Sequence, residues 1–289
     1  HLERRHPAVG SKRCEECERL RVVDVEVRAG DERRMAGDHV HRAHVVRLFG
    51  RDDVVQYYIA KYGSQAIMPY AYLGNEGLVQ GLTSGDAFFN KLGSTVNEKT
   101  FCASGSSTAW LLTVGPTGGV DPESFVHCKY IVIWACNSIS TNLHHWPFVL
   151  EAQKRGAKVV VIDSYKSRTA KAGDWHICPK PGTDGALAMG FIHSIIAQGL
   201  VDQEWVDKHT YGYPELKYRA ADFSPEHVEK ITGVKAADIR KFAKEFATAQ
   251  PSVIRLGVAL ERHAGGGQAI RAVCALPALV GSWKHVGGG

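Results

Sequence analysis

Two apolar runs of this sequence lead directly into residues that could bind a ligand. The run KYIVIWAC is followed by Asn137 and Ser138, and the run KVVVID ends in Asp163 and is followed by Ser164. Amides, hydroxyls and carboxylates of this kind can hold the phosphate, ribose or base of a nucleotide. For Asp163 a second interpretation is as good, because Asp is common in turns for reasons of local backbone geometry.

A third apolar run, PSVIRLGVAL at residues 251–260, leads into a stretch that mixes charge with glycine. Gly257 lies within the run, which is followed by Glu261-Arg262-His263-Ala264-Gly265-Gly266-Gly267. Consecutive glycines let the backbone approach a flat or phosphorylated ligand closely. By themselves they fit a plain flexible connection between a strand and a helix at least as well.

The elements that would position these residues are three buried strands of one parallel sheet. Apolar runs of this kind are typical of strands that are covered on both faces. WPFVLEAQKRG, between the first two runs, has Pro147 in the first turn of a helix and Gly156 at its stop. Strand, helix and strand then form a βαβ unit, so we predict an α/β fold with a doubly wound, mostly parallel sheet and flanking helices. Ligands of such sheets bind beyond the carboxyl ends of the strands.

Further helices are predicted on both sides of this unit. DVVQYYIAKYG is typical of a helix that ends at Gly63, and GTDGALAMGFIHSIIAQGL has an apolar stripe with Asp184 as its N-cap. Three more helices are predicted in SPEHVEKITG, KAADIRKFAKEFATA and GGGQAIRAVCALPALVG. The segment 74–119 is rich in Gly, Ser and Thr and shows little period; its aromatic residues favour order.

Several familiar nucleotide and metal motifs are missing from the sequence. No G-x-G-x-x-G follows the first strand, and no G-x-x-x-x-G-K-[ST] occurs, which weakens ordinary dinucleotide and P-loop interpretations. His176 and Cys178 would supply two zinc ligands at most, and the adjacent His144 and His145 point different ways on a loop. We therefore interpret all four residues as structural, or as residues that support ligand-binding side chains without binding a ligand themselves.

Taken together, three stretches resemble the molybdopterin oxidoreductase family. They are ACNSISTNLHHWPF, VVVIDSYKSRTAKAGDWHICPKPGTDGALAMGFIHSIIAQGLVD and LERHAGGGQAIRAVCALPALVGSWKHVGGG. The resemblance is to the dimethyl-sulfoxide-reductase type, which includes formate dehydrogenases and periplasmic nitrate reductases, and it spans about residues 52–289. It implies α/β domains that hold molybdopterin guanine dinucleotide, in the form with two pterins on one molybdenum (Mo-bis-MGD).

The resemblance also implies roles for individual residues. Asn137 matches the Asn of the family's G-x-N-P turn near the cofactor's phosphates, where Ala135 and Ser138 replace the Gly and Pro. Asp163 matches the aspartate at the guanosine end, and Asp184 matches the aspartate that recognises guanine, although its sequence position also suits a helix N-cap. The other positions implied to bind the cofactor are Ser138, Ser164, Arg168, Thr169, Gly182, Thr183, Gly257, Arg262, Gly265 and Gly266.

The metal end of the cofactor falls on the stretch TFCASGSST. In this family the molybdenum takes four dithiolene sulfurs and often one Ser, Cys or selenocysteine, so the resemblance makes Cys102 the first candidate ligand and Ser104 an alternative. A thiolate is a soft ligand suited to such a centre, but Cys102 could also be an inert buried thiol. The resemblance places His263 on the pterin side, and we count it with Cys102 and Ser104 as catalytic candidates.

The segment before residue 52 differs in composition from the rest. Residues 1–50 hold ten Arg and one Lys, whereas residues 51–289 hold eight Arg and sixteen Lys. We leave 1–51 unassigned, as a non-native segment from a shifted reading frame or a disordered one. Cys14 and Cys17 match only the first spacing of the [4Fe–4S] motif expected of the parent enzyme, so this cluster is not supported by the residues present.

The remaining chain is predicted to form three parts. They are a first α/β part with the active-site loop at 52–128, a Rossmann-like guanine-dinucleotide domain at 129–250, and a return to the first domain at 251–289, truncated where relatives continue.

A net charge of +5 is too small and scattered to favour nucleic acid, and no apolar window suggests a membrane span. Seven irregularly spaced cysteines favour a reducing compartment, so we expect a cytoplasmic protein.

These observations predict part of a molybdenum oxidoreductase that performs two-electron redox or oxygen-atom transfer on a small substrate. An electron-transfer iron–sulfur subunit would be its natural partner. Two alternatives stay open from the sequence: a nucleotide-binding α/β dehydrogenase or transferase, and an inactive truncated paralogue.

Overall fold

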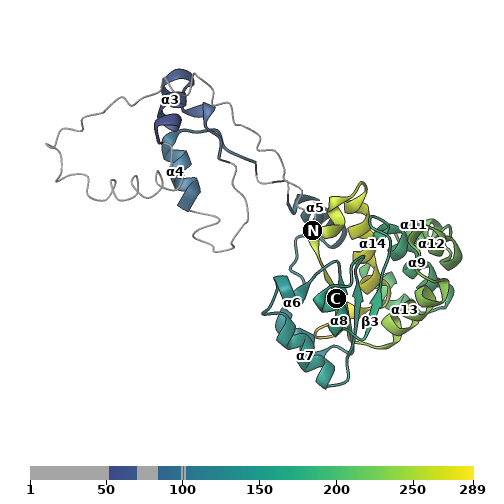
Figure 1. Ribbon diagram of the computed structural model, residues 1–289. Helices are drawn as coiled ribbons and strands as arrows, with labels where there is room; N and C mark the ends of the chain where they lie inside the picture. Colours follow the sequence, from purple (N-terminus) through teal and green to yellow (C-terminus); the bar gives the residue numbers. More distant parts are fainter. Residues whose placement is uncertain (1–51, 70–83, 99, 101) are drawn as a thin grey trace, which may run out of the picture. The chain divides into compact units, whose positions relative to one another are not determined.

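The computed structural model describes residues 52–69, 84–98, 100 and 102–289 (Figure 1). The chain divides into two compact units, His1–Lys99 and Thr100–Gly289. The segment 1–51, with Cys14 and Cys17, lies outside the described residues. The three-part division predicted for residues 52–289 stays a prediction.

The first unit contains the helix that the sequence predicts. Helix α3 spans Asp52–Tyr62 and is stopped by Gly63, whose φ of +85° is a left-handed conformation and whose amide donates to the Ile59 carbonyl at 2.9 Å. A 3-10 turn, η1, follows at Ser64–Ala66, and helix α4 spans Ser84–Leu92.

The second unit begins with a helix for which the sequence shows no period. Helix α5 spans Ser104–Val114, inside the stretch that we expected to be ordered but irregular. Its apolar residues are consecutive, as in Ala109-Trp110-Leu111-Leu112, and its first turn consists of Ser and Gly. The sequence of α5 therefore lacks the apolar stripe, with apolar residues three and four positions apart, by which a helix is predicted.

A four-stranded parallel sheet forms the centre of the second unit, which confirms the predicted α/β fold. Its strands are β1 Tyr130–Trp134, β2 Lys158–Ile162, β3 Trp175–Ile177 and β4 Ser252–Leu256, in the order β3-β2-β1-β4. Val132 of β1 lies opposite Val160 of β2 and Ile254 of β4, so every strand runs in the same direction. All three predicted apolar runs are strands of this sheet.

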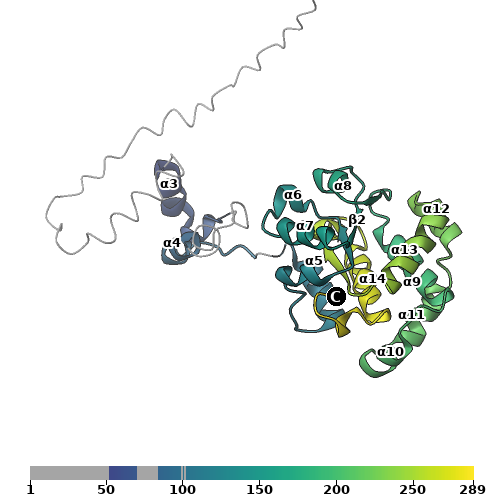
Figure 2. The ribbon, with the colours of Figure 1, turned by 90° about the horizontal axis from the view of Figure 1, so that it is seen from below.

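Helices cover both faces of the sheet (Figures 1 and 2). The helices after α5 are η3 Pro122–His127, α6 Ser138–Thr141, α7 Trp146–Lys154, α8 Arg168–Ala172, α9 Asp184–Ala197, α10 Gln203–His209, α11 Tyr213–Ala220, α12 Pro225–Thr232, α13 Ala236–Thr248, η4 Val258–Arg262, α14 Gly266–Leu279 and η5 Ser282–Lys284.

The side chains of β1 alternate between the two helical layers. Tyr130, Val132 and Trp134 pack with α5, α9, α13 and α14. Ile131 and Ile133 pack on the other face with the 3-10 helix η3, α7 and α8.

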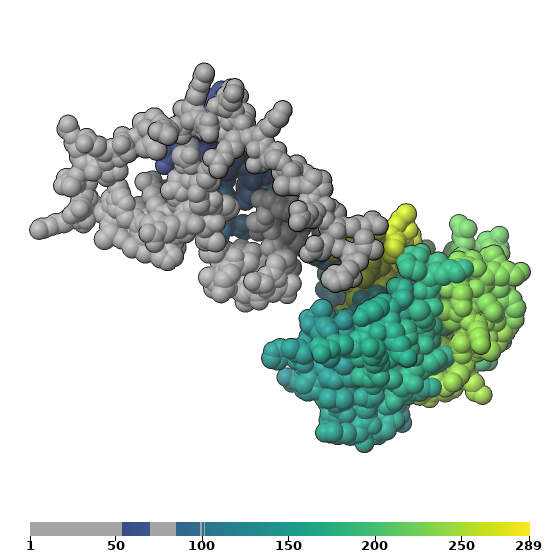
Figure 3. Space-filling view, viewed as in Figure 1, coloured from purple at the N-terminus to yellow at the C-terminus, as the bar shows by residue number. Residues whose placement is uncertain are grey.

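The segment from α10 to α13 forms one end of this unit, away from α6 and α7, and its green surface is visible in Figure 3. In the part of the chain that the structure describes, we find no helix with the length and apolar character needed to cross a membrane.

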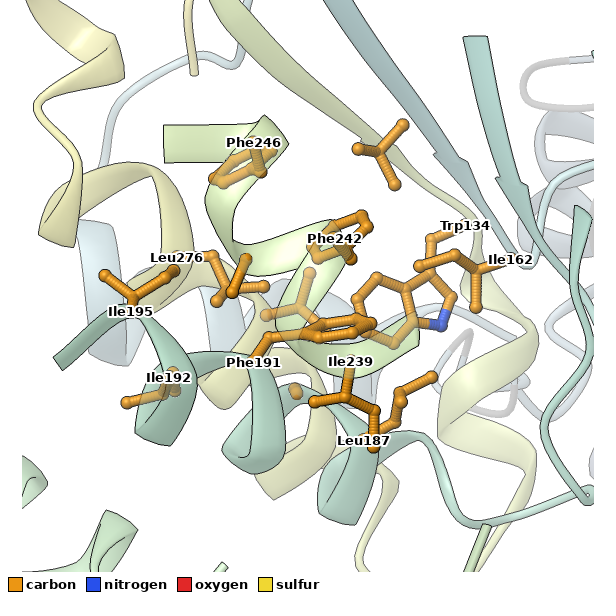
Figure 4. Close-up of a cluster of buried hydrophobic side chains, with 14 of the residues drawn as sticks. Trp134, Ile162, Leu187, Phe191, Ile192, Ile195, Ile239, Phe242, Phe246 and Leu276 are labelled. Atoms are coloured by element: carbon orange, nitrogen blue, oxygen red, sulfur yellow. The ribbon is translucent and has the colours of Figure 1, made fainter. Parts of the chain in front are cut away.

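Aromatic rings from three elements fill the larger core (Figure 4). Phe191 of α9 stacks on Phe242 of α13 with ring centroids 3.9 Å apart, and Trp134 of β1 meets Phe191 edge to face at 5.8 Å. All three side chains are fully buried. This cluster holds α9 and α13 against the carboxyl end of β1, where the predicted site begins.

Replacing Phe242 with Ala should lower the free energy of unfolding by about 3–5 kcal/mol, because it removes a buried ring and leaves a cavity. Urea unfolding followed by circular dichroism measures this loss. Tyr218→Ala is the control, since Tyr218 is 78% exposed and its loss should change stability by less than about 0.5 kcal/mol. Equal effects of the two substitutions would contradict the assignment of Phe242 to the core.

Candidate functional site

The carboxyl ends of β1, β2 and β4 meet at one edge of the sheet because the strands are parallel. The connections after β1 and β4 also touch each other. A Cβ built on Gly257 would lie 1.9 Å from the Ala135 carbonyl oxygen, so only glycine fits at this point. The structure thus brings the predicted ligand-binding connections together.

Asn137, after β1, is oriented by a buried threonine of α8. The Thr169 hydroxyl accepts the Ile139 amide hydrogen at 3.1 Å, so its own hydrogen is directed to Asn137 Oδ1, 2.8 Å away. The Asn137 Nδ2 group has no hydrogen-bond partner among the described residues. The two amide hydrogens of Asn137 are therefore open to a ligand, whereas the Thr169 hydroxyl is already engaged by Ile139 and Asn137.

Ser138 turns its hydroxyl into the protein. The residue is fully buried, and its Oγ lies 3.3 Å from His145 Nδ1 and 3.6 Å from Cys136 Sγ. His145 is also buried, at 2% exposure, and its Nε2 has no hydrogen-bond partner in the part of the chain that the structure describes. Burial, and secondarily the nearby Arg255 cation, lower the pKa of His145 to about 4, so the imidazole is neutral at pH 7.

Asp163 and Ser164, after β2, are braced by strand β3 and the residue that follows it. The Asp163 carboxylate accepts the Tyr165 amide at 3.1 Å, and the Asp163 carbonyl lies 2.8 Å from His176 Nε2. Cys178 Sγ donates to the Ser164 carbonyl at 3.5 Å. His176 and Cys178 thus have a structural role, and Asp163 serves its local turn with one oxygen.

The connection before α9 lies against the connection after β4. Gly182 has a φ of +78°, and a Cβ there would lie 3.1 Å from His263 Nδ1. Thr183 is the N-cap of α9, but its hydroxyl donates to the Lys180 carbonyl at 2.7 Å instead of capping the helix. The backbone angle favours glycine at 182, and a side chain there would also press on the His263 imidazole.

Asp184 is not the N-cap that the sequence suggests. It is the first residue of α9, and its Oδ1 accepts the indole hydrogen of Trp134 at 2.8 Å. Its other oxygen has no hydrogen-bond partner among the described residues. The tertiary contact with β1 takes the side chain away from the helix end, which removes the competing interpretation of this carboxylate.

The start of α5 carries the predicted metal-end residues. Cys102 and Ser104 are half-buried there, and Arg262 Nη2 lies 3.5 Å from Cys102 Sγ. Glu261 Oε2 accepts hydrogen bonds from the Ser106 amide and, at 2.7 Å, from the Ser106 hydroxyl. A cation therefore faces the candidate thiolate, and a carboxylate ties its helix to the connection after β4.

Glu261 is the residue of this site that sequence reasoning missed. Its side chain is only 5% exposed, and besides Ser106 it pairs with Arg262 Nη1 at 3.1 Å. The available signal was a lone acidic residue in a stretch of basic residues and glycines. That signal is weak because most acidic residues in such stretches are solvated.

The glycines at the start of α14 are required by the backbone conformation and by close packing. Gly265 is the N-cap of α14 with a φ of +76°, and a Cβ on Gly266 would lie 2.3 Å from the Leu260 carbonyl oxygen. Their conformation and crowding explain both glycines without a ligand. His263 and Arg262 remain exposed on the same connection.

A cavity of about 720 Å³ opens beside this edge, between α5, the loop before α7 and the end of β4. Its polar lining includes Ser106, Ser107, Asn142, His145 and Arg255. Within the described ranges, no three His, Cys, Asp or Glu side chains come close enough to hold a metal ion.

Comparison with known proteins assigns the chain to a family. A family model described as molybdopterin oxidoreductase matches residues 52–289, and the chain therefore belongs to this family, as its motifs predict. The chain is 39% identical over 231 residues to the probable oxidoreductase YoaE of Bacillus subtilis, covering 80% of this chain and 34% of that protein.

Two further comparisons point to acetylene hydratases. The chain is 34% identical over 190 residues to acetylene hydratase of Syntrophotalea acetylenica, covering 62% of this chain and 26% of that protein. The solved structure of acetylene hydratase from Pelobacter acetylenicus matches with a TM-score of 0.63 and 28% identity, over 84% of this chain and 32% of that one. The chain thus spans about a third or less of the length of these relatives.

Ala135→Gly should raise the free energy of unfolding by about 0.5–1 kcal/mol. Ala135 has a φ of +51°, a conformation that costs an L-residue about 1–2 kcal/mol and that glycine adopts freely, at some cost in unfolded-state entropy. Thermal unfolding measures the change. Ala157→Gly, at a buried alanine just before β2 without a positive φ, should destabilise instead; stabilisation by both would refute the explanation.

The stability of this unit should fall as pH drops from 6.5 to 4. The folded-state pKa of His145 lies below its unfolded value, so the unfolded chain binds the proton first, and the loss reaches about 3 kcal/mol at pH 4. His145→Asn, which can keep the bond to Ser138, should flatten this dependence in urea unfolding at each pH. His144→Asn, at the exposed neighbour, should leave it unchanged. An equally steep dependence in His145→Asn would contradict this assignment.

Proposed function

We propose that this chain is the part of a molybdenum oxidoreductase that binds molybdopterin guanine dinucleotide. In the parent enzyme it would serve two-electron redox or oxygen-atom transfer on a small substrate. The observation that carries the proposal is the carboxyl-end edge of the sheet in a chain of this family, where Asn137 and Asp163 follow the strands β1 and β2. Asp184 is bonded to Trp134 at the end of β1, and Arg262, in the connection after β4, lies beside Cys102.

The guanine end of the cofactor fits Asp184. A carboxylate can accept hydrogen bonds from both N1–H and the N2 amino group of guanine. Asp184 is half-buried, one oxygen is oriented by Trp134, and the other has no partner among the described residues. These two acceptor oxygens suit guanine and do not suit adenine, because N1 of adenine is itself an acceptor and adenine therefore offers no adjacent pair of donors to one carboxylate.

The phosphates fit the connections after β1 and β2. Asn137 offers its amide hydrogens, and Arg168, exposed at the first position of α8, offers a guanidinium. Both groups donate hydrogen bonds, and arginine pairs with phosphate in a two-pronged geometry. We assign the pyrophosphate of the cofactor to these residues.

The metal end fits the start of α5. When bound, the molybdenum–pterin group supplies the two-electron chemistry, and the protein supplies orientation, charge and access. Cys102 would hold the metal through its sulfur, and Arg262 would stabilise the thiolate. Glu261 would hold Arg262 by their ion pair and would hold the start of α5 by its hydrogen bonds to Ser106. Ser104 is the alternative ligand, and His263 lies on the pterin side next to Gly182.

The setting of the parent enzyme is part of the proposal. Five cysteines of the described residues carry free thiols, which supports a reducing compartment such as the cytoplasm. An iron–sulfur subunit is proposed as the electron-transfer partner. A [4Fe–4S] cluster is proposed for the parent enzyme, and none of the described residues supports one in this chain.

A non-redox reaction is the second candidate. Two of the comparisons are with proteins named acetylene hydratase, so this family membership is compatible with hydration as well as with redox chemistry. Membership in the family argues against the ordinary nucleotide dehydrogenase that the sequence left open. An inactive paralogue remains the third alternative.

Metal analysis and cofactor extraction from the full-length natural protein test the proposal. We expect molybdenum together with a pterin that releases a guanine nucleotide on hydrolysis. Absence of both would refute the proposal and favour an inactive paralogue. A loaded enzyme that hydrates its substrate without transferring electrons to an acceptor would establish the second candidate.

A further inference from the structure

We infer that Trp134 is a positioning residue for guanine recognition, because its indole N–H fixes the orientation of the Asp184 carboxylate. The inference rests on the proposed function, which assigns the guanine to Asp184, and deepens it by naming the residue that sets the specificity of that carboxylate.

Trp134 is held rigidly enough to act in this way. It is the last residue of β1, its side chain is fully buried, and Phe191 packs against its ring at 73° (Figure 4). An indole has a single hydrogen-bond donor, and a buried one needs a partner. The direction of the N–H is therefore set by the core, and it ends on Asp184 Oδ1 at 2.8 Å.

Asp184 has no comparable restraint from its own helix. It is the first residue of α9, but its carboxylate does not cap the helix, and Trp134 is its hydrogen-bond partner among the described residues. A carboxylate that accepts two parallel hydrogen bonds from one base has to keep its plane aligned with the plane of that base. Without the indole donor the side chain would lose this restraint and a charge-assisted hydrogen bond.

The arrangement leaves room for the base. Oδ1 can accept a second hydrogen bond beside that of the indole, and Oδ2 is unpartnered among the described residues. Guanine donates from N1 and N2 to such a pair. The Trp134 hydrogen bond should therefore raise the affinity for guanine nucleotides specifically and leave adenine nucleotides unaffected.

Binding of GDP and ADP to the full chain, measured by calorimetry, tests this role. Trp134→Phe should weaken GDP binding about 3–10-fold, the cost of one lost hydrogen bond and one freed rotamer, with ADP binding unchanged. The control is Tyr130→Phe on the same strand. Tyr130 is 1% exposed and donates to Glu245 Oε2 at 3.0 Å, at the opposite end of β1, so its loss should leave the GDP/ADP ratio unchanged.

A second replacement guards against unfolding of the Trp134→Phe protein. Benzothienylalanine at position 134 keeps the shape of tryptophan and lacks only the N–H, and it should lower the GDP/ADP ratio by the same factor. An unchanged ratio, or equal losses for both nucleotides, would overturn the role of Trp134.

Failure of the proposed function gives a different result. If the unaltered chain shows no preference for GDP, or if Asp184→Asn leaves its preference intact, the assignment of guanine to Asp184 is wrong and the role of Trp134 falls with it. If Asp184→Asn abolishes the preference and both replacements of Trp134 preserve it, only the role of Trp134 is refuted.

Discussion

The parallel pairing of β1 with β2 on one side and β4 on the other is the constraint on which the site depends. It brings connections that are more than ninety residues apart in the chain to one edge of the sheet. Strand β1 is buried along its whole length, so its register and direction cannot shift without exposing apolar surface. The proposed contacts of Asn137 and Asp163 with the cofactor are therefore anchored to rigid strand ends, which is where α/β sheets bind ligands.

Side chains at this edge act in pairs, in which one residue orients the other. Thr169 orients Asn137, Trp134 orients Asp184, and Glu261 joins Ser106 to Arg262. In each pair the orienting residue is buried or nearly so, while its partner is the more exposed. Burial of the first member gives it a single geometry, and that geometry is passed to the residue that would touch the cofactor.

Local patterns were sufficient to predict the strands and most of the long helices. Each signal lies within a few residues of the element it predicts, because burial patterns and helix caps are local. The signals were the apolar runs of the strands, Pro147 and Gly156 at the two ends of α7, and the apolar stripe of α9. Pattern analysis failed for α5, whose apolar residues are consecutive, and for Asp184, where a local rule for helix caps gave way to a partner on β1. It also overlooked Glu261, because nothing in the neighbouring residues shows that its side chain is buried.

The sequence by itself determined the class of fold, the family and the strand ends at which a ligand would bind, because these follow from hydrophobic runs and from motifs of fixed spacing. Only the tertiary structure decided which of these side chains stay open to a ligand and which turn into the protein. Ser138 and Thr169 stand among the predicted binding residues but turn into the protein, whereas Trp134 and Glu261 gain their importance from partners 50 and 155 residues away. Contacts at that separation depend on how the sheet and helices assemble, and no local pattern encodes them.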